Sequence, residues 1–228
     1  MSRRKKRIVI IMLVVVGLLV VTYGVLNYYN LIPQKVYSGA DFGIEIVLSE
    51  SDYNQNGIDD YTDILLGARA DAENKPKYKS KYYDGGYPPD DEGVCTDVIW
   101  RAFQSAGYSL KDMVDEHISS NVELYPRVEG KPDGNIDFRR VPNLKVFFDN
   151  CAVSYSLDPN DIEQWQPGDI VIFGKNYKHI GIVSDKRNRD GVCYMIHNSG
   201  QPKREEDALL DWERVQGITG HYRFENIK

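Results

Sequence analysis

The sequence is poor in cysteine and histidine, and it has no internal repeat. Three cysteines and four histidines in 228 residues exclude a small domain held together by disulfides, which needs a much denser set of cysteines. The absence of repeats and of low-complexity tracts excludes a solenoid and a disordered linker protein. The length allows one domain of roughly 150 to 200 residues with an appendage.

Basic charge is also scarce beyond the N-terminus. Five of the 28 Lys and Arg residues lie within residues 3–7, which leaves 23 basic residues against 34 acidic ones, a formal charge of −11. This excess of negative charge argues against nucleic acid as a partner. It is compatible with a calcium site, because such sites are built from oxygen ligands.

Only one long apolar run is present, and it follows the basic cluster. Residues 8–26 are uncharged and almost wholly apolar, and 19 residues of helix span nearly the ~30 Å of a bilayer core. The preceding basic residues predict that this end stays in the cytoplasm. We therefore expect a single-pass protein of the cell membrane with an extracellular C-terminal domain. A cleaved signal peptide is the alternative.

Residues 52–63 match the spacing of a twelve-residue calcium-binding loop. Gly57 stands at the sharp turn of position 6, and residues 61–72 are expected to form the exiting helix. An Asp at the last position resembles the loops of dockerins. The alternative is a solvated turn that caps the helix through Asp59 or Asp60. The predicted calcium ligands are the side chains of Asp52, Asn54, Asn56, Asp60 and Asp63 with the carbonyl of Ile58.

The rest of the chain predicts an α+β domain. Short β-branched or aromatic runs in the C-terminal third indicate an antiparallel sheet, and helices that precede such a run pack on it. The predicted helices are residues 93–106, 111–118 and 144–150, and the predicted strands are residues 169–173, 179–184, 192–198 and 218–224.

Cys95 falls in the first turn of the helix predicted for residues 93–106. Free N–H groups and the helix dipole can lower a cysteine pKa there, from ~8.5 towards ~3.5 to 7.5. We therefore interpret Cys95 as a nucleophile, with a small buried core residue as the alternative. Cys151 and Cys193 are interpreted as core residues or as a disulfide.

His179 and His197 lie on neighbouring predicted strands, so their imidazoles can meet across the hairpin. A thiol hydrolase needs a base that reaches the sulfur and a polar group that fixes the tautomer of that base. We assign His179 as the base and His197 as the orienting group. His117 and His221 have no predicted partner of this kind and are interpreted as structural.

Five short motifs resemble, in their order along the chain, those of cell-wall cysteine peptidases of the NlpC type. The shared features are a Tyr-x-x-Gly-Gly loop, a Cys that opens a helix, a Pro-Gly-Asp strand start, a His-x-Gly-Ile strand and a polar residue on the next strand. They stand here at residues 82–86, Cys95, residues 167–169, residues 179–182 and His197. The chain resembles the domain-of-unknown-function family 1287 still more closely, over about residues 68–224.

The resemblance implies a papain-like, NlpC-type fold and acyl transfer by a thiolate at Cys95 paired with an imidazolium at His179. It also implies that Tyr82 or Tyr83 lies near the oxyanion, with the N–H of Cys95 as a second donor. Where the peptidases have Asp-Cys-Ser-Gly, this chain has Val-Cys-Thr-Asp at residues 94–97. Recognition of a free amino group is therefore not carried over. Asp97 either complements the helix dipole or contacts substrate.

We expect a membrane-anchored cysteine peptidase or amidase that acts on peptidoglycan peptides, with structural Ca²⁺ and no catalytic cofactor. The alternatives are a thiol acyltransferase and a catalytically silent, calcium-stabilised wall-binding module. The predicted organisation is a basic tip and anchor in residues 1–27, a tether in 28–43, the calcium loop and its helix in 44–75, and the hydrolase domain in 76–228.

Overall fold

The computed structural model describes residues 2–225, which fall into two compact units, Met1–Gln34 and Lys35–Lys228. The first unit contains helix α1, Arg3–Tyr28, which is apolar beyond its basic first turns and has no buried residue. Its length and composition suffice to cross a membrane, and a signal sequence has the same character. The predicted apolar helix is confirmed, whereas its orientation stays a prediction.

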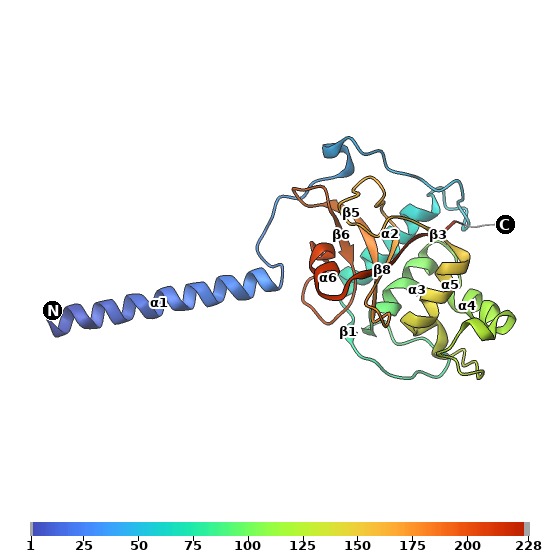
Figure 1. Cartoon of the computed structure of the whole chain (residues 1–228), viewed down its shortest axis with the longest axis horizontal. Coiled ribbons are helices and arrows are strands. Elements are labelled where there is room, and N and C mark those ends of the chain that lie inside the picture. The colour runs from blue at the N-terminus through green and yellow to red at the C-terminus, as the bar shows by residue number, and fades with distance from the viewer. Residues whose placement is uncertain (1, 226–228) are drawn as a thin grey trace. The chain divides into compact units, whose positions relative to one another are not determined.

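The second unit mixes helices and strands (Figure 1). Its helices are α2 (Asp60–Asn74), α3 (Cys95–Ser105), α4 (Leu110–Ser120), α5 (Val141–Cys151) and α6 (Leu209–Gln216). Single turns of 3-10 helix lie at Gly39–Phe42, Val122–Leu124 and Asp137–Arg139. The strands are β1 (Lys77–Tyr78), β2 (Glu92–Gly93), β3 (Val153–Ser154), β4 (Ile170–Phe173), β5 (His179–Arg187), β6 (Cys193–Ile196), β7 (Glu205–Glu206) and β8 (Ile218–Arg223).

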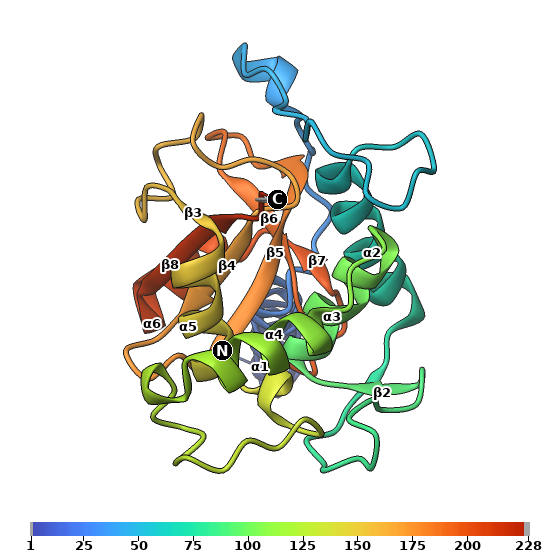
Figure 2. The ribbon, with the colours of Figure 1, turned by 90° about the vertical axis from the view of Figure 1, so that its right-hand side faces the viewer.

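Six of these strands form one sheet in the order β3-β8-β4-β5-β6-β7, and every neighbouring pair is antiparallel (Figure 2). The sheet predicted from the sequence is therefore confirmed. His179 stands opposite Phe173 at the start of β5, and Ile182 stands opposite Ile196 of β6. Both edge strands have only two residues, which limits the unpaired backbone that a sheet edge exposes.

Both faces of the sheet are buried, because apolar side chains alternate between them along each strand. Ile170, Ile172 and Ile180 belong to the core that contains residues of α2, α3, α4 and α5. Val171, Phe173, Val183 and Met195 belong to a second core with Trp165 and with Leu209 of α6. Figure 1 shows the strands between α6 on one side and α2, α3 and α5 on the other.

Helix α2 is part of the same compact unit, although residues 44–75 were expected as a separate segment. It crosses α3 closely at Gly67. A Cβ atom at Gly67 would lie 2.5 Å from the Cβ of Ser105 and 3.0 Å from the Cα of Ala102. Only glycine therefore allows this approach, which sets α2 against the helix that begins with Cys95.

Candidate active site

The first turn of α3 is held by an acidic residue at its third position. Val94 has extended backbone angles and ends the preceding segment, so Cys95 is the first residue of the helix. The Oδ2 atom of Asp97 accepts the N–H of Val94 at 2.7 Å. This cap by the Asp97 side chain places Cys95 at the helix N-terminus, as the sequence predicts.

Asp97 has no oxygen left for a substrate. Arg139 donates from Nε to Oδ1 at 2.7 Å and from Nη2 to Oδ2 at 2.9 Å, and the indole of Trp100 donates to Oδ1 at 2.8 Å. The side chains of Asp97 and Arg139 are 0% and 2% exposed. The structure therefore gives Asp97 the first of the two predicted roles, at the helix N-terminus.

The sulfur of Cys95 lies beside the first residues of β5. The residue is 6% exposed and packs in the same core as Ile180 of β5. Burial raises the pKa of the Cys95 thiol to about 11, and the charge of Asp97 adds to this effect. The low pKa expected from the helix N-terminus is therefore wrong for this conformation, because desolvation outweighs the dipole.

The two histidines meet as predicted. Nε2 of His179 lies 2.8 Å from Nδ1 of His197, with the rings nearly perpendicular at 86°. His197 also engages β7, because its Nε2 lies 3.0 Å from Oε1 of Glu206. Glu206 was not predicted, since a two-residue edge strand has no periodicity that could reveal it.

An aromatic ring covers the imidazole of His179. The indole of Trp212 in α6 stacks on the imidazole of His179 with centroids 4.1 Å apart and 13° between the planes. Burial holds the pKa of His179 well below its usual range, and the neighbouring His197 lowers it further. Burial also lowers the pKa of His197, although its hydrogen bond with Glu206 opposes this effect. Both imidazoles are therefore neutral near pH 7.

Neither predicted oxyanion tyrosine interacts with Cys95. The hydroxyl of Tyr82 lies 3.2 Å from the carboxylate of Asp133, and that of Tyr83 donates to Glu92 at 2.7 Å. Tyr78 of β1 pairs with Gly93, two residues before Cys95. Burial raises the pKa of Tyr78, and the thiol group of Cys95 is the next largest cause. The parallel pairing of β1 with β2 positions Tyr78, and no local sequence pattern signals this.

In the structure described for residues 2–225, no hydrogen bond joins the sulfur of Cys95 to either imidazole. His179 uses Nε2 for His197, so Nδ1 is the ring nitrogen that has no hydrogen-bond partner among these residues. Nδ1 is therefore the atom that can accept a proton from Cys95.

The predicted calcium loop brings four of its ligand side chains together. Asp52 accepts the N–H groups of Asn56 at 3.0 Å and Gly57 at 2.8 Å. The side-chain amides of Asn54 and Asn56 both donate to Oδ2 of Asp63, at 2.8 and 2.9 Å. Two carboxylates and two amides thus converge, which fits an oxygen-seeking cation in residue type.

The ligands expected at the other loop positions are placed differently. Asp60 points inward, where it accepts the N–H of Tyr53 at 2.8 Å and the hydroxyl of Tyr108 at 2.5 Å. It is 2% exposed, and neither of these two contacts is with another predicted ligand. The N–H of Ile58 donates to Asn56, while Asp59 caps α2. Across residues 2–225, no group of three or more His, Cys, Asp or Glu side chains is placed to hold a metal.

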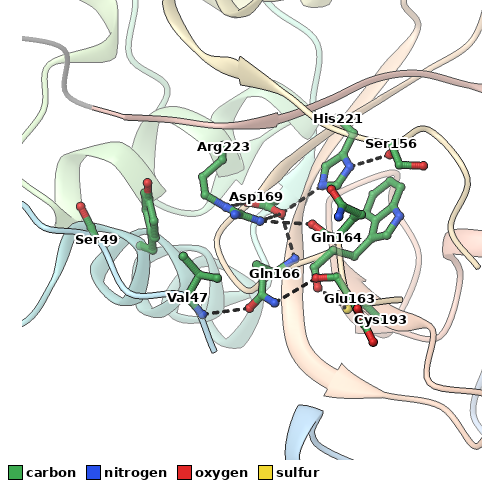
Figure 3. A network of polar contacts seen from close by, with 12 residues as sticks. Val47, Ser49, Ser156, Glu163, Gln164, Gln166, Asp169, Cys193, His221 and Arg223 are labelled. Atoms are coloured by element: carbon green, nitrogen blue, oxygen red, sulfur yellow. Dashed lines mark hydrogen bonds and ion pairs between the residues drawn. The ribbon is translucent and has the colours of Figure 1, made fainter. Parts of the chain in front are cut away.

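A second buried polar cluster, shown in Figure 3, joins β4 to β8 away from the histidine pair. Asp169 accepts two hydrogen bonds from Arg223, at 2.7 and 2.8 Å, and lies 3.0 Å from Nε2 of His221. Nδ1 of His221 lies 2.7 Å from the carbonyl of Ser156, and its ring stacks on Trp165. Both nitrogens of His221 are therefore occupied, in keeping with a structural role.

The two remaining cysteines are free thiols in the described structure. Cys193 is buried in the core on the α6 side of the sheet, and Cys151 is half-buried at the end of α5. Of the two interpretations left open by the sequence, the structure therefore shows core residues.

Comparison with known proteins places most of the second unit in one family. Residues 65–224 match the family described as "Domain of unknown function (DUF1287)". The uncharacterized protein YijF of Escherichia coli K12 is 40% identical over 153 residues, which cover 65% of this chain and 72% of that protein. No solved structure matches the chain.

Proposed function

The chain belongs to the DUF1287 family, and we propose that it is a membrane-anchored thiol hydrolase that cleaves amide bonds. Cys95 is the nucleophile, His179 the base and His197 its orienting group. One observation carries the proposal: the imidazoles of His179, at the start of β5, and His197, just after β6, pair at 2.8 Å, and Ile180 beside His179 packs in the same core as Cys95. A nucleophile, a base and an orienting group thus come from the start of α3, the start of β5 and the end of β6.

The reaction starts from a neutral thiol and a neutral imidazole. As the sulfur of Cys95 attacks the amide carbon, its proton passes to Nδ1 of His179 and the carbonyl becomes an oxyanion. The backbone N–H of Cys95 and the hydroxyl of Tyr78 are the proposed oxyanion donors. This scheme replaces the thiolate–imidazolium pair expected from the sequence, because burial disfavours both charged forms.

Breakdown of the tetrahedral intermediate completes the cycle. The C–N bond breaks and the Nδ1–H of His179 protonates the leaving amine, which leaves a thioester on Cys95. A water molecule then gives one proton to Nδ1 and attacks the thioester, and that proton returns to the departing sulfur. The products are an amine, a carboxylic acid and the original thiol.

The finer parts of the proposal depend on the resemblance to NlpC-type peptidases. A papain-like fold is supported by a cysteine that opens a helix packed on an antiparallel sheet with histidines at adjoining strands. Peptidoglycan peptides are the proposed substrate, with the domain held outside the membrane by α1. The apolar character of α1 supports an anchor.

A catalytically silent module is the second candidate function. It is favoured by one observation, the burial that raises the pKa of the Cys95 thiol to about 11. An inert core cysteine has this property. Turnover distinguishes the two candidates, because a silent module releases no product from any amide.

The test is incubation of the full-length chain in detergent with defined muropeptides, followed by mass spectrometry of the products. We expect cleavage by the wild type and none by Cys95→Ala or His179→Ala, while His197→Ala loses less activity than either. Cys151→Ala is the matched control, since it removes another free thiol. Turnover by Cys95→Ala at the wild-type rate would refute the assignment. Transfer of the acyl group to an amine in place of water would identify an acyltransferase.

A further inference from the structure

The edge strand β7 connects to the histidine pair through one carboxylate. Oε1 of Glu206 lies 3.0 Å from Nε2 of His197, and the two side chains are 7% and 1% exposed. A carboxylate only accepts hydrogen bonds, so the proton of this contact must be on Nε2 of His197. A neutral imidazole carries one N–H, and Nδ1 of His197 is therefore bare.

The tautomer of His179 is fixed in the same way by its contact with His197. The bare Nδ1 of His197 lies 2.8 Å from Nε2 of His179, so Nε2 of His179 must donate. Nδ1 of His179 is then bare as well. A single carboxylate thus sets the positions of two protons, and it leaves a proton acceptor on the nitrogen that His197 does not use.

A neighbouring amide does not reverse this order. The side-chain nitrogen of Gln201 lies 3.0 Å from Nε2 of His197, but it also donates to the carbonyl of His197 at 3.1 Å. Its oxygen accepts from the N–H of Ser199 at 2.8 Å and from Arg204 at 3.0 Å. Gln201 therefore has an acceptor for one of its protons elsewhere, whereas the carboxylate of Glu206 has no proton to offer His197.

We propose that Glu206 is a positioning residue that selects the Nε2–H tautomer of both His197 and His179 and leaves Nδ1 of His179 free to accept the proton of Cys95. The importance of this arrangement for turnover depends on the proposed hydrolase function, whereas the tautomers themselves do not. When Nδ1 takes the proton, the new positive charge is stabilised through His197 by Glu206, and neither Nε2 proton has to move.

The adjacent residue provides a matched control. Glu205 precedes Glu206 in β7, and its side chain lies on the other face of the strand. It accepts from Arg69 at 2.7 Å, from Lys186 at 2.6 Å and from Ser184 at 2.6 Å. Glu205→Gln therefore removes one negative charge from the same strand. These three contacts of Glu205 involve neither His179 nor His197.

Long-range ¹H–¹⁵N spectra of the histidine rings test the proposal directly, because they distinguish a protonated ring nitrogen from a bare one. The full-length chain in detergent has only four histidines, so variants can assign each ring. In the wild type and in Glu205→Gln, we expect His179 and His197 to be protonated at Nε2 alone. In Glu206→Gln, whose amide can donate or accept, we expect His197 to lose its single tautomer.

Two results would overturn the inference: His197 protonated at Nδ1 in the wild type, or unchanged tautomers in Glu206→Gln. Muropeptide turnover is the second measurement, and Glu206→Gln is expected to lose tenfold or more while Glu206→Asp recovers part of the loss. If the wild type cleaves nothing but shows the expected tautomers, the proposed function fails and the role of Glu206 in selecting the tautomers stands. If the wild type cleaves muropeptides but shows the other tautomers, the proposed function stands and the role of Glu206 in selecting the tautomers fails.

Discussion

Asp97 and Arg139 form a buried bidentate ion pair in the turn that carries Cys95. Its two hydrogen bonds measure 2.7 and 2.9 Å, and the same carboxylate accepts the N–H of Val94. The pair joins the start of α3 to the 3-10 turn Asp137–Arg139. The placement of Cys95 therefore depends on a contact between residues 42 positions apart.

The first prediction concerns this pair. Asp97→Asn removes one charge and leaves the guanidinium of Arg139 buried without its counterion, so we expect the free energy of unfolding to fall by about 3 to 5 kcal/mol. Urea denaturation of the full-length chain measures this change as a lower midpoint at an unchanged slope.

The control for this experiment is Asp112→Asn, which removes an exposed acid from the first turn of α4. It is expected to cost less than about 0.5 kcal/mol. Replacing both partners with apolar residues, as Asp97→Leu with Arg139→Met, should recover part of the stability lost in Asp97→Asn. Equal midpoints for Asp97→Asn and Asp112→Asn would contradict the buried pair.

The second prediction concerns acid stability. Burial lowers the pKa values of His179 and His197, so the unfolded chain takes up protons below about pH 6.5 that the folded chain does not. Stability is therefore full above that pH and decreases as the pH falls, by up to about 1.4 kcal/mol per pH unit for each histidine. Urea denaturation between pH 7 and pH 5 measures this slope.

A double variant isolates the contribution of the pair. His179→Gln with His197→Gln should flatten the pH dependence relative to the wild type. The pKa of His117 is also lowered by burial, but its contribution cancels because both proteins contain it. Parallel slopes in the two proteins would show that neither His179 nor His197 is held neutral by the fold.

The third prediction concerns the thiol of Cys95. Since burial raises its pKa to about 11, only a small fraction is thiolate at neutral pH. Alkylation of Cys95 by iodoacetamide should accelerate about tenfold per pH unit between pH 7 and pH 10, measured by peptide mass spectrometry. A rate that reaches its plateau near pH 6 would instead indicate a thiolate in the resting protein.

The fourth prediction concerns calcium, and the loop stays a prediction until it is tested. At ~1 mM calcium, a ~10⁻⁵ M site contributes about 2.7 kcal/mol, and a ~10⁻³ M site only about 0.4 kcal/mol. The tighter case raises the melting temperature by roughly 5 to 10 °C. Melting curves in EGTA and in a calcium titration measure the shift.

Asp52→Ala combined with Asp63→Ala should abolish that shift, because these are the two carboxylates at the centre of the loop. Asp211→Ala removes an exposed acid from α6 and is the control that should keep the shift. Identical wild-type curves in EGTA and in 10 mM calcium would reduce the loop to a capped turn that precedes α2.

Local sequence patterns determined the elements and the order of the reactive residues. The spacing of apolar residues marked α3, and the short β-branched or aromatic runs marked β4, β5, β6 and β8. The start of a helix at Cys95 and the pairing of His179 with His197 followed from these elements. Such signals depend on neighbours within about four residues or on adjacent strands, so the sequence alone contains them.

The tertiary structure decided the properties that arise from distant segments. Residues of β5 and the α2–α5 core bury Cys95, and this desolvation reverses the expected thiol pKa. Tyr78, Glu206 and Trp212 reach the site from two-residue strands and a short helix that have no distinctive period. Their positions depend on long-range packing, because burial and hydrogen bonding link residues that the sequence keeps far apart.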